Sequence, residues 1–436
     1  MNRTTTMIST KRIQLAAALA AFALSLPALS LQPLQAFVAS AHEKNPDALE
    51  ATANVRQRQA LADFALDKQL PGITAFGTFT KNQYESTLDL APPGAPPNVV
   101  TIVAGSQFDA AATLRVPLID IAAFERIASA RTSTKAATAQ LEAVRLQIEA
   151  QVVQSYYQLV ANLALVTASR QALDVSRANF KLANDRFQAG ASPELEADRA
   201  RADVEQQVQQ VASAELQVSL AARALESQTG LAADVAQTIR LDDDLHPEQE
   251  LPAFEKALDT LPALQAARET TNAAQQDVQA GRYAAIPTLA GSFTERGTSA
   301  AGFTGHDFTW QAALTLSWAF DLGYFSNVKV QQAAVDAARA RELRARLVAS
   351  DSIHRQWNTV LADIARSRSA RAGREAAQHA STQARDRYQA GAATQLDLLQ
   401  AQRDAFTADV ALIQANADLV NARTQLRLAA GQRLEK

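Results

Sequence analysis

The chain has 436 residues, of which 47% are hydrophobic and 20% charged, and its formal net charge is −3. This near-neutral balance excludes the basic footprint of a nucleic-acid-binding domain, so we expect no nucleic acid among its partners. Cysteine is absent, which excludes disulfides, thiolate metal sites, cysteine nucleophiles and an acylated N-terminal cysteine. After the N-terminus no hydrophobic run is long enough for a transmembrane helix, so any membrane crossing must use β-strands.

Residues 1–36 have the pattern of a secretory signal peptide. Lys11 and Arg12 provide a positive start, a hydrophobic stretch follows, and Ala36 closes a plausible cleavage motif. A cytosolic amphipathic N-terminus is the alternative, but the segment carries no acidic residue. We therefore expect an exported protein, not lipidated, whose mature chain begins near Phe37.

Glycine and proline are distributed very unevenly, and the stretches without them predict long helices. Neither residue occurs between Pro117 and Gly190, and an uninterrupted helix over most of this stretch would be roughly 100 Å long. A second long stretch is broken only by Gly373. The predicted helices are 121–189, 193–229, 324–390 and 393–430.

Two of these helices show regular hydrophobic spacing. In the first, the steps of three and four residues predict one buried face. Its members are Leu141, Val144, Ile148, Val152, Tyr156, Leu159, Leu163 and Val166. In the last helix, a 3.5-residue repeat with Arg403 as its one polar member predicts a left-handed coiled coil. Its hydrophobic members are Leu396, Leu399, Phe406, Val410, Ile413, Ala417 and Val420.

The chain contains an internal repeat. Segment 185–191, Asp-Arg-Phe-Gln-Ala-Gly-Ala, recurs as 386–392, Asp-Arg-Tyr-Gln-Ala-Gly-Ala, displaced by 201 positions. Proline pairs farther upstream are displaced by 216, so the first copy carries about fifteen additional residues, and the proline-rich stretch 91–97 is their natural place in a loop. We expect two structural repeats, over 37–240 and 241–436.

Each repeat is also predicted to contain two strands, over about 71–120 and 287–321. From Phe308 to Phe320 hydrophobic and polar residues alternate, and aromatic residues lie at both ends of the hydrophobic face, as in the girdles of membrane barrels. A soluble sandwich strand would show the same period, but strands of ten or more residues fit a tilted membrane crossing better. Four strands with open edges cannot lie in lipid, so several copies must share one barrel. The predicted fold class is an α+β membrane protein.

Several short motifs recur in the same order in the two repeats. The repeats open with Asn45-Pro46 and with Leu261-Pro262-Ala263-Leu264, and the strand ends read Val-Pro-Leu-Ile-Asp at 116–120 and Ser-Trp-Ala-Phe-Asp at 317–321. Two Arg-aromatic-Gln-Ala-Gly turns complete the pattern. Over essentially the whole mature chain, this order resembles the TolC family of outer-membrane efflux and secretion channels.

The resemblance implies an architecture and a set of partners. Four strands from each protomer of a homotrimer would form a twelve-stranded barrel in outer-membrane lipid. The long helices would continue as an α-helical tunnel across the periplasm of a Gram-negative bacterium. Cargo would arrive from an inner-membrane transporter through a periplasmic adaptor, also called a membrane fusion protein.

The resemblance also implies that the two helix-turn-helix tips form the closed entrance and the docking surface for the adaptor. A tight reversal often needs a positive φ, which gives glycine a physical reason to occupy each tip. An ordinary helix end would explain either glycine alone, whereas the repeated flanking residues favour a shared role. The tip residues are Ala189, Gly190, Ala191, Ala390, Gly391 and Ala392.

Family members place acidic residues at the entrance constriction, where three-fold symmetry would turn one carboxylate into a cation-favouring ring. Here Glu196 and Asp397 each stand six residues after a tip glycine. Gln400 occupies the place of a second acid, and the family's usual gating arginine is missing, so Arg387 and Arg403 are the substitutes that the sequence offers. Solvated charges on a helix surface are the alternative for each of these residues.

The residue patterns of catalysis are missing from the sequence. No phosphate-binding loop, nucleophile elbow or zinc motif occurs, and the five histidines lack ligand spacing, so we expect no enzyme, cofactor or metal. The run 242–244 near His246 could hold a cation, but an acidic turn is the more common explanation. The energy for export must therefore come from a partner protein.

These observations favour a trimeric exit duct of a tripartite efflux pump. One alternative keeps the architecture but changes the cargo to polypeptides, as in type I protein secretion. Another, from a different class, is a periplasmic coiled-coil adaptor, for which alanine-rich heptads would suffice and which would have no membrane strands.

Overall fold

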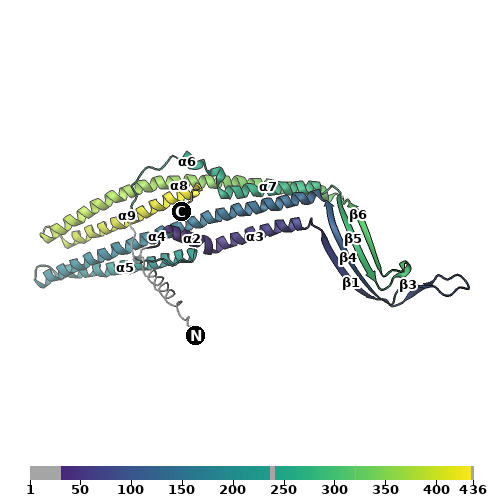
Figure 1. The fold of residues 1–436 in the computed structure, drawn as a ribbon. Coiled ribbons are helices and arrows are strands. Elements are labelled where there is room, and N and C mark those ends of the chain that lie inside the picture. The colour runs from purple at the N-terminus through teal and green to yellow at the C-terminus, as the bar shows by residue number, and fades with distance from the viewer. Residues whose placement is uncertain (1–30, 236–240, 320, 434–436) are drawn as a thin grey trace, which may run out of the picture. The chain divides into compact units, whose positions relative to one another are not determined.

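The computed structural model describes residues 31–235, 241–319 and 321–433, and Figure 1 shows its elements. Long helices are combined with a small antiparallel sheet, so the predicted α+β class is confirmed. In the described residues no helix has both the length and the hydrophobicity to cross a bilayer. The elements are α2 Leu34–Lys44, α3 Pro46–Asp67, β1 Gly72–Lys81, β2 Ser86–Asp89, β3 Val99–Val103, β4 Ser106–Ile119, α4 Ile121–Gln188, α5 Glu194–Thr229, α6 Leu251–Glu255, η1 Leu258–Thr260, α7 Pro262–Tyr283, β5 Thr288–Thr298, η2 Gly302–Thr304, β6 Phe308–Ser317, α8 Gly323–Gln389 and α9 Gln395–Ala429.

Two helices are exceptionally long. Helix α4 has 68 residues and contains no glycine or proline, which gives it a length of roughly 100 Å. Helix α8 has 67 residues and continues through Gly373. A single interior glycine costs only about 1 kcal/mol relative to alanine, which a helix with this many backbone hydrogen bonds can absorb.

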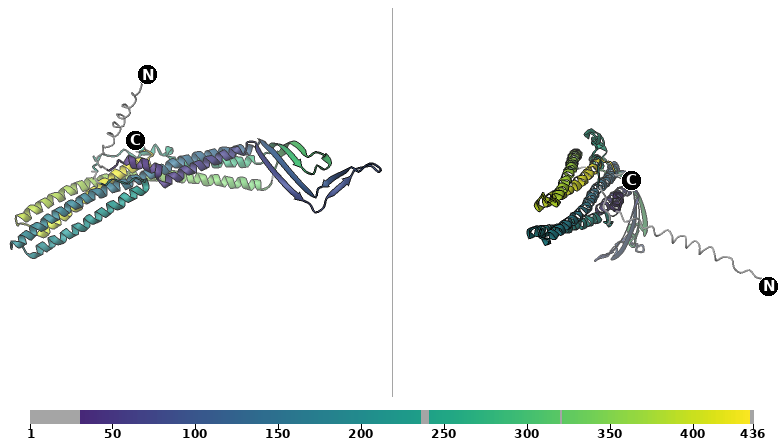
Figure 2. Two further views of the ribbon diagram at one scale, coloured as in Figure 1. Left: turned by 60° about the horizontal axis from the view of Figure 1, so that its bottom comes forward. Right: turned by 90° about the vertical axis from the view of Figure 1, so that its left-hand side faces the viewer.

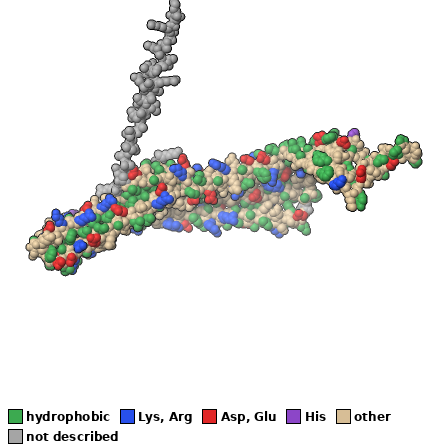
Figure 3. All heavy atoms as spheres, turned by 90° about the horizontal axis from the view of Figure 1, so that it is seen from below, with side chains coloured by type: hydrophobic (Ala, Val, Ile, Leu, Met, Phe, Trp, Pro, Cys, Tyr) green, Lys and Arg blue, Asp and Glu red, His purple; other side chains and the backbone are tan. Residues whose placement is uncertain are grey.

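The chain forms two compact units. The helical unit comprises the described residues up to Ala48 together with 145–256 and the chain from Ser352 onward, and it contains both helical hairpins. The sheet unit comprises 49–144 and 257–351 and contains every strand found in the described residues. On the face drawn in Figure 3, positive and negative side chains are interspersed along the helices, with no extended patch of one sign.

The predicted hydrophobic face of α4 is largely confirmed. Seven of its eight members are buried, and Val144 is half-buried. In α9 the prediction was wrong for Leu396, which is 58% exposed. Near the end of α9, Ala417 of the predicted repeat is buried and Val420 is half-buried, but the buried residues also include Leu419, Leu426 and the polar Asn416 and Arg423. Hydrophobic spacing alone cannot identify a face that buries polar groups with their partners.

Residues 31–36, which the predicted cleavage after Ala36 would remove, are packed in the helical unit, whereas residues 1–30 of the predicted signal peptide lie outside the described residues. Leu31 and Leu34 are buried, and the Gln32 side chain donates to the carbonyl of Ala232 at 3.1 Å. This packing favours cleavage before Leu31. We expect N-terminal sequencing of the mature protein to begin at or before Leu31, and a start at Phe37 would contradict this prediction.

The main sheet has four antiparallel strands in the order β1-β4-β5-β6. The additional residues of the first repeat form a second, two-stranded hairpin of β2 and β3, with the proline-rich stretch 91–97 in the loop between them. Strands β1 and β6 lie at the two edges of the main sheet. Each of these edge strands therefore directs a row of backbone N–H and C=O groups away from the rest of the sheet.

The register divides the main sheet into a hydrophobic and a polar face. Ile73 pairs with Leu114, and Leu289 pairs with Leu316, so hydrophobic side chains meet on one face across neighbouring strands. On the other face, Thr113 bonds Thr294 at 2.9 Å and Arg296 pairs with Asp109 at 2.8 Å. The exposed hydrophobic residues of the first face include Ile73, Phe79, Phe108, Phe293, Phe308, Trp310, Leu314 and Leu316.

Candidate functional site at the hairpin turns

The two predicted tips have the same backbone geometry. The first hairpin, α4 and α5, turns at Gly190 with φ of 69°, and the second hairpin, α8 and α9, turns at Gly391 with φ of 76°. In both, the glycine N–H donates to the carbonyl three residues earlier and the next N–H to the carbonyl five residues earlier. This pair of hydrogen bonds ends a helix most easily at a glycine, because glycine has no side chain that would clash in the left-handed conformation. All six predicted tip residues are exposed.

The two hairpins lie side by side in the helical unit (Figure 2). Side chains near the turns connect them. The guanidinium of Arg186 lies 4.7 Å from the ring centroid of Tyr388 and donates to the carbonyl of Gln389 at 3.3 Å. Tyr388 is 4% exposed, and its hydroxyl donates to Glu196 Oε2 at 3.2 Å. The side-chain amide of Gln395 donates to the carbonyl of Glu196 at 2.6 Å.

Burial raises the pKa of the Tyr388 hydroxyl above its ordinary value, and the Glu196 carboxylate acts in the same direction. The hydroxyl therefore stays protonated at neutral pH and remains a hydrogen-bond donor. A protonated tyrosine beside a carboxylate and beneath a guanidinium links three helices at one point. Glu196, which was predicted because it stands six residues after the tip glycine in the sequence, is thus part of the contact between the hairpins.

A second polar layer lies farther from the turns. Asp203 is 5% exposed and accepts from Ser176 Oγ at 2.7 Å and from Arg403 Nη2 at 3.1 Å. Arg403 also donates to Gln206 at 3.2 Å. A buried carboxylate needs such a cation, because desolvation of an unpaired charge is costly. The predicted gating candidate Arg403 therefore holds α9 against α5.

The other predicted residues are not brought together with this network. Asp397 is exposed and forms a capping box, accepting from the hydroxyl of Thr394 at 2.7 Å and from its N–H at 3.0 Å. The hydrogen bond from the Thr394 hydroxyl lowers the pKa of the Asp397 carboxyl, which is therefore ionised at neutral pH. Gln400 donates to Asp404 at 3.0 Å, and Arg387 is exposed without a side-chain partner in the described residues.

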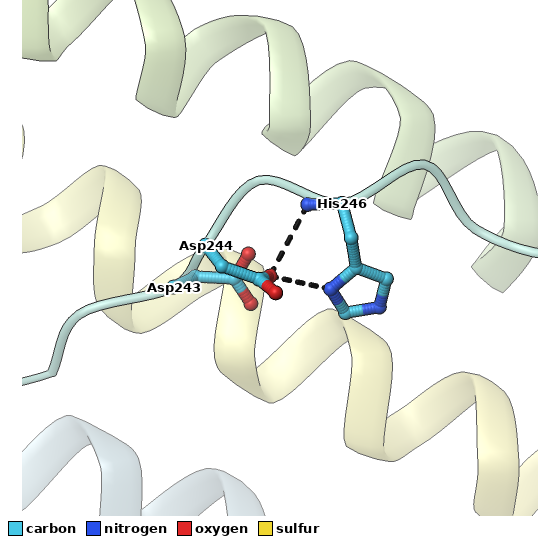
Figure 4. Close-up of side chains that lie close together, drawn as sticks. All are labelled: Asp243, Asp244 and His246. Carbon is cyan, nitrogen blue, oxygen red and sulfur yellow. Dashed lines mark hydrogen bonds and ion pairs between the residues drawn. The ribbon is translucent and has the colours of Figure 1, made fainter.

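The acidic turn near His246 is built around a buried arginine of α9. Arg423 is 5% exposed, with Nε 3.0 Å from Asp243 and Nη1 donating to Glu248 at 2.6 Å and to His246 Nε2 at 2.8 Å. Figure 4 shows Asp243, Asp244 and His246 together, with the Nδ1 of His246 bonded to the Asp244 carboxylate. The prediction of an acidic turn was therefore incomplete, because one guanidinium pairs both with Asp243 of the run and with Glu248, which follows it.

Sequence reasoning missed Arg186, Tyr388, Asp203 and Arg423. The first two lie in the repeated heptapeptides. Tyr388 stands where the first copy has Phe187, and this difference was the signal that the two copies differ chemically. Asp203 and Arg423 carried no signal of their own, because a charged residue inside a long helix is usually solvated. Their burial depends on which helices pack against them.

Comparison with known proteins agrees with this architecture. A family model described as outer membrane efflux protein matches residues 38–231 and 253–432. The fusaric acid resistance protein FusA of Burkholderia cepacia is 26% identical over 200 residues, and this match covers 45% of the present chain but 36% of that relative.

Two solved structures share the fold over most of their lengths. The CmeC outer membrane channel of Campylobacter jejuni has a TM-score of 0.76 and 19% identity, covering 93% of this chain and 86% of its own. The outer membrane protein VceC of Vibrio cholerae has a TM-score of 0.75 and 20% identity, covering 91% of this chain and 96% of its own. Since the family model matches most of the sequence, this chain belongs to the outer membrane efflux protein family.

Proposed function

We propose that the protein is a homotrimeric outer-membrane channel that serves as the exit duct of a tripartite efflux pump. The observation that carries this proposal is the four-stranded sheet, which exposes a hydrophobic face and ends in two edge strands. Phe308, Trp310 and Leu316 of β6 are 75%, 72% and 69% exposed. Such a face needs a hydrophobic environment, and lipid supplies it along the whole sheet.

Closure of the barrel follows from the backbone. Edge strands β1 and β6 cannot face hydrocarbon with unpaired N–H and C=O groups, so each pairs with an edge of another copy. Three copies supply twelve strands. The polar face, with Thr113, Thr294, Asp109 and Arg296, then lines the lumen.

The hairpin tips form the periplasmic entrance in this proposal. Asp397, Glu196 and Gln400 line its constriction, and the exposed tips around Gly190 and Gly391 dock the adaptor. Both bonds from Thr394 reach Oδ2 of Asp397, which leaves Oδ1 for a cation. A ring of three such ionised carboxylates favours cations over anions.

The partners are a periplasmic adaptor and an inner-membrane transporter, which supplies the energy. Membership of an outer membrane family removes the coiled-coil adaptor alternative. The relative FusA is named for resistance to a small molecule, which favours small-molecule cargo over the polypeptides of type I secretion. A deletion strain with restored drug sensitivity and intact protein secretion would support this choice.

The first test is the native mass of protein extracted in detergent from purified outer membranes, together with its single-channel conductance in a planar bilayer. We expect a heat-dissociable trimer with small, cation-selective conductance, and Asp397→Ala should reduce the selectivity. A monomer without conductance would overturn the proposal.

The hydrophobic face of β6 offers a second test. Replacing Leu314 and Leu316 with arginine should abolish outer-membrane assembly, since each arginine near the bilayer midplane costs about 2–4 kcal/mol. Ala313→Arg combined with Thr315→Arg is the matched control, because it adds the same two charges to the polar face of the same strand. Fractionation of outer membranes measures the outcome, and equal assembly of the two variants would contradict a lipid-facing role for this face.

A further inference from the structure

The contact between the two hairpins uses a different set of side chains from each. The first hairpin contributes Arg186, Glu196 and Asp203. The second hairpin contributes Tyr388, Gln395 and Arg403. Five of these six residues are buried or half-buried, with Arg403 as the exception. Each hairpin therefore uses one of its faces in this contact.

The internal repeat places a copy of each contact set on the other hairpin. At the offset of 201, the set from the first hairpin corresponds to Arg387, Asp397 and Asp404 on the second. The set from the second hairpin corresponds to Phe187, Glu194 and Ala202 on the first. All six of these corresponding residues are exposed. The chain thus presents both halves of one further contact, on two different hairpins that cannot reach each other with these faces.

We propose that a second copy of this chain completes the contact, with its first hairpin seated on the free face of the second hairpin. The proposal rests on the homotrimer proposed above. A head-to-tail contact of this kind joins unlike faces and closes into a ring when the rotation allows. Within such a ring, contacts between the two hairpins of one chain alternate with contacts between the hairpins of neighbouring chains, made at corresponding positions of the repeat.

The chemistry of the contact between chains differs from that inside the chain. Asp404 corresponds to Asp203, but the place of Arg403 is taken by Ala202, which carries no charge. The neighbouring Arg201 is exposed and corresponds to Gln402, whose side chain already spans the internal contact to Asn179 at 2.6 Å. Arg201 of the partner subunit therefore pairs with Asp404.

Near the turns, the same correspondence sets Arg387 over the ring of Phe187 of the partner subunit. Phe187 is 39% exposed and lacks the hydroxyl with which Tyr388 bonds Glu196. The contact between chains, which we call the seam, therefore has a cation over an aromatic ring and an ion pair, but no hydrogen bond from a hydroxyl to Asp397. It has fewer hydrogen bonds than the contact inside the chain.

Charge reversal tests the pair directly. Arg201→Asp and Asp404→Arg each set like charges across the seam, so each should lower the trimer fraction of detergent-extracted protein at least about tenfold. The double variant restores opposite charges and should recover most of the trimer. Arg223→Asp is the matched control, because Arg223 is an exposed arginine of the same helix, far along α5 from Arg201, and its ion-pair partner Glu226 lies in the same helix. A double variant no better than the worse single variant would overturn the pairing.

Crosslinking provides a readout that does not depend on trimer stability. The chain has no cysteine, so Arg201→Cys with Asp404→Cys creates the one thiol pair for a short bismaleimide. We expect dimers and trimers on denaturing gels, whereas Asp203→Cys with Arg403→Cys should give crosslinked monomer. If wild-type protein is not a trimer, the proposed function fails. If it is a trimer but the 201/404 pair gives no intermolecular product, this seam alone is wrong.

Discussion

Replacing Arg423 with alanine should lower the free energy of unfolding of the helical unit by about 3–5 kcal/mol, because Asp243 and Glu248 lose the cation that pairs with them. The side chains of all three residues are less than a tenth exposed. Removing only the cation leaves two buried carboxylates facing a low-dielectric interior. Urea denaturation of detergent-solubilised protein measures the loss, and limited proteolysis should detect release of segment 241–250.

Arg427→Ala is the matched control, since Arg427 lies one turn farther along α9 and is exposed. Exposed substitutions away from special features usually change stability by about 0.5 kcal/mol or less. Neutralising the whole cluster with Asp243→Asn, Glu248→Gln and Arg423→Met should recover part of the loss. Equal effects of the two alanine variants would contradict a stabilising role for the buried cluster.

The fold was predictable because its signals are local and duplicated. The absence of breakers between Pro117 and Gly190 predicted the first long helix, and the alternation after Phe308 predicted a strand whose two faces differ. The fifteen additional residues were correctly located, but they form the β2-β3 hairpin as well as a loop. Strand propensity in so short a segment is too weak to identify a hairpin without its pairing partner.

The candidate site was predictable in position but not in chemistry. The turns occur at the two predicted glycines, because a positive φ is a local requirement. Asp397 was predicted as a constriction acid, whereas the structure adds a capping role that the Thr394-x-x-Asp397 spacing could have indicated. The roles of Asp203 and Arg423 depend on contacts between distant segments, which no local pattern contains.

Replacing Arg403 with alanine should loosen the contact between the two hairpins and raise the single-channel conductance several-fold. Asp203 would remain buried with Ser176 as its hydroxyl donor but without a cation. Because the Arg403 side chain is 47% exposed, water screens the pair, and we expect a loss of stability of about 1–2 kcal/mol rather than the larger cost of a fully buried pair.

A double-mutant cycle with Asp203→Asn distinguishes loss of the Arg403–Asp203 ion pair from a general loss of stability of the helices. If the ion pair holds the hairpins together, the double variant should lose less stability than the sum of the single variants. Arg199→Ala removes an exposed arginine from α5 and should leave the conductance unchanged. Arg403→Lys keeps the charge but loses the two-nitrogen contact with Asp203, so its conductance should lie between those of the wild type and the alanine variant. Unchanged conductance in Arg403→Ala would show that this pair stabilises the helical unit without controlling its opening.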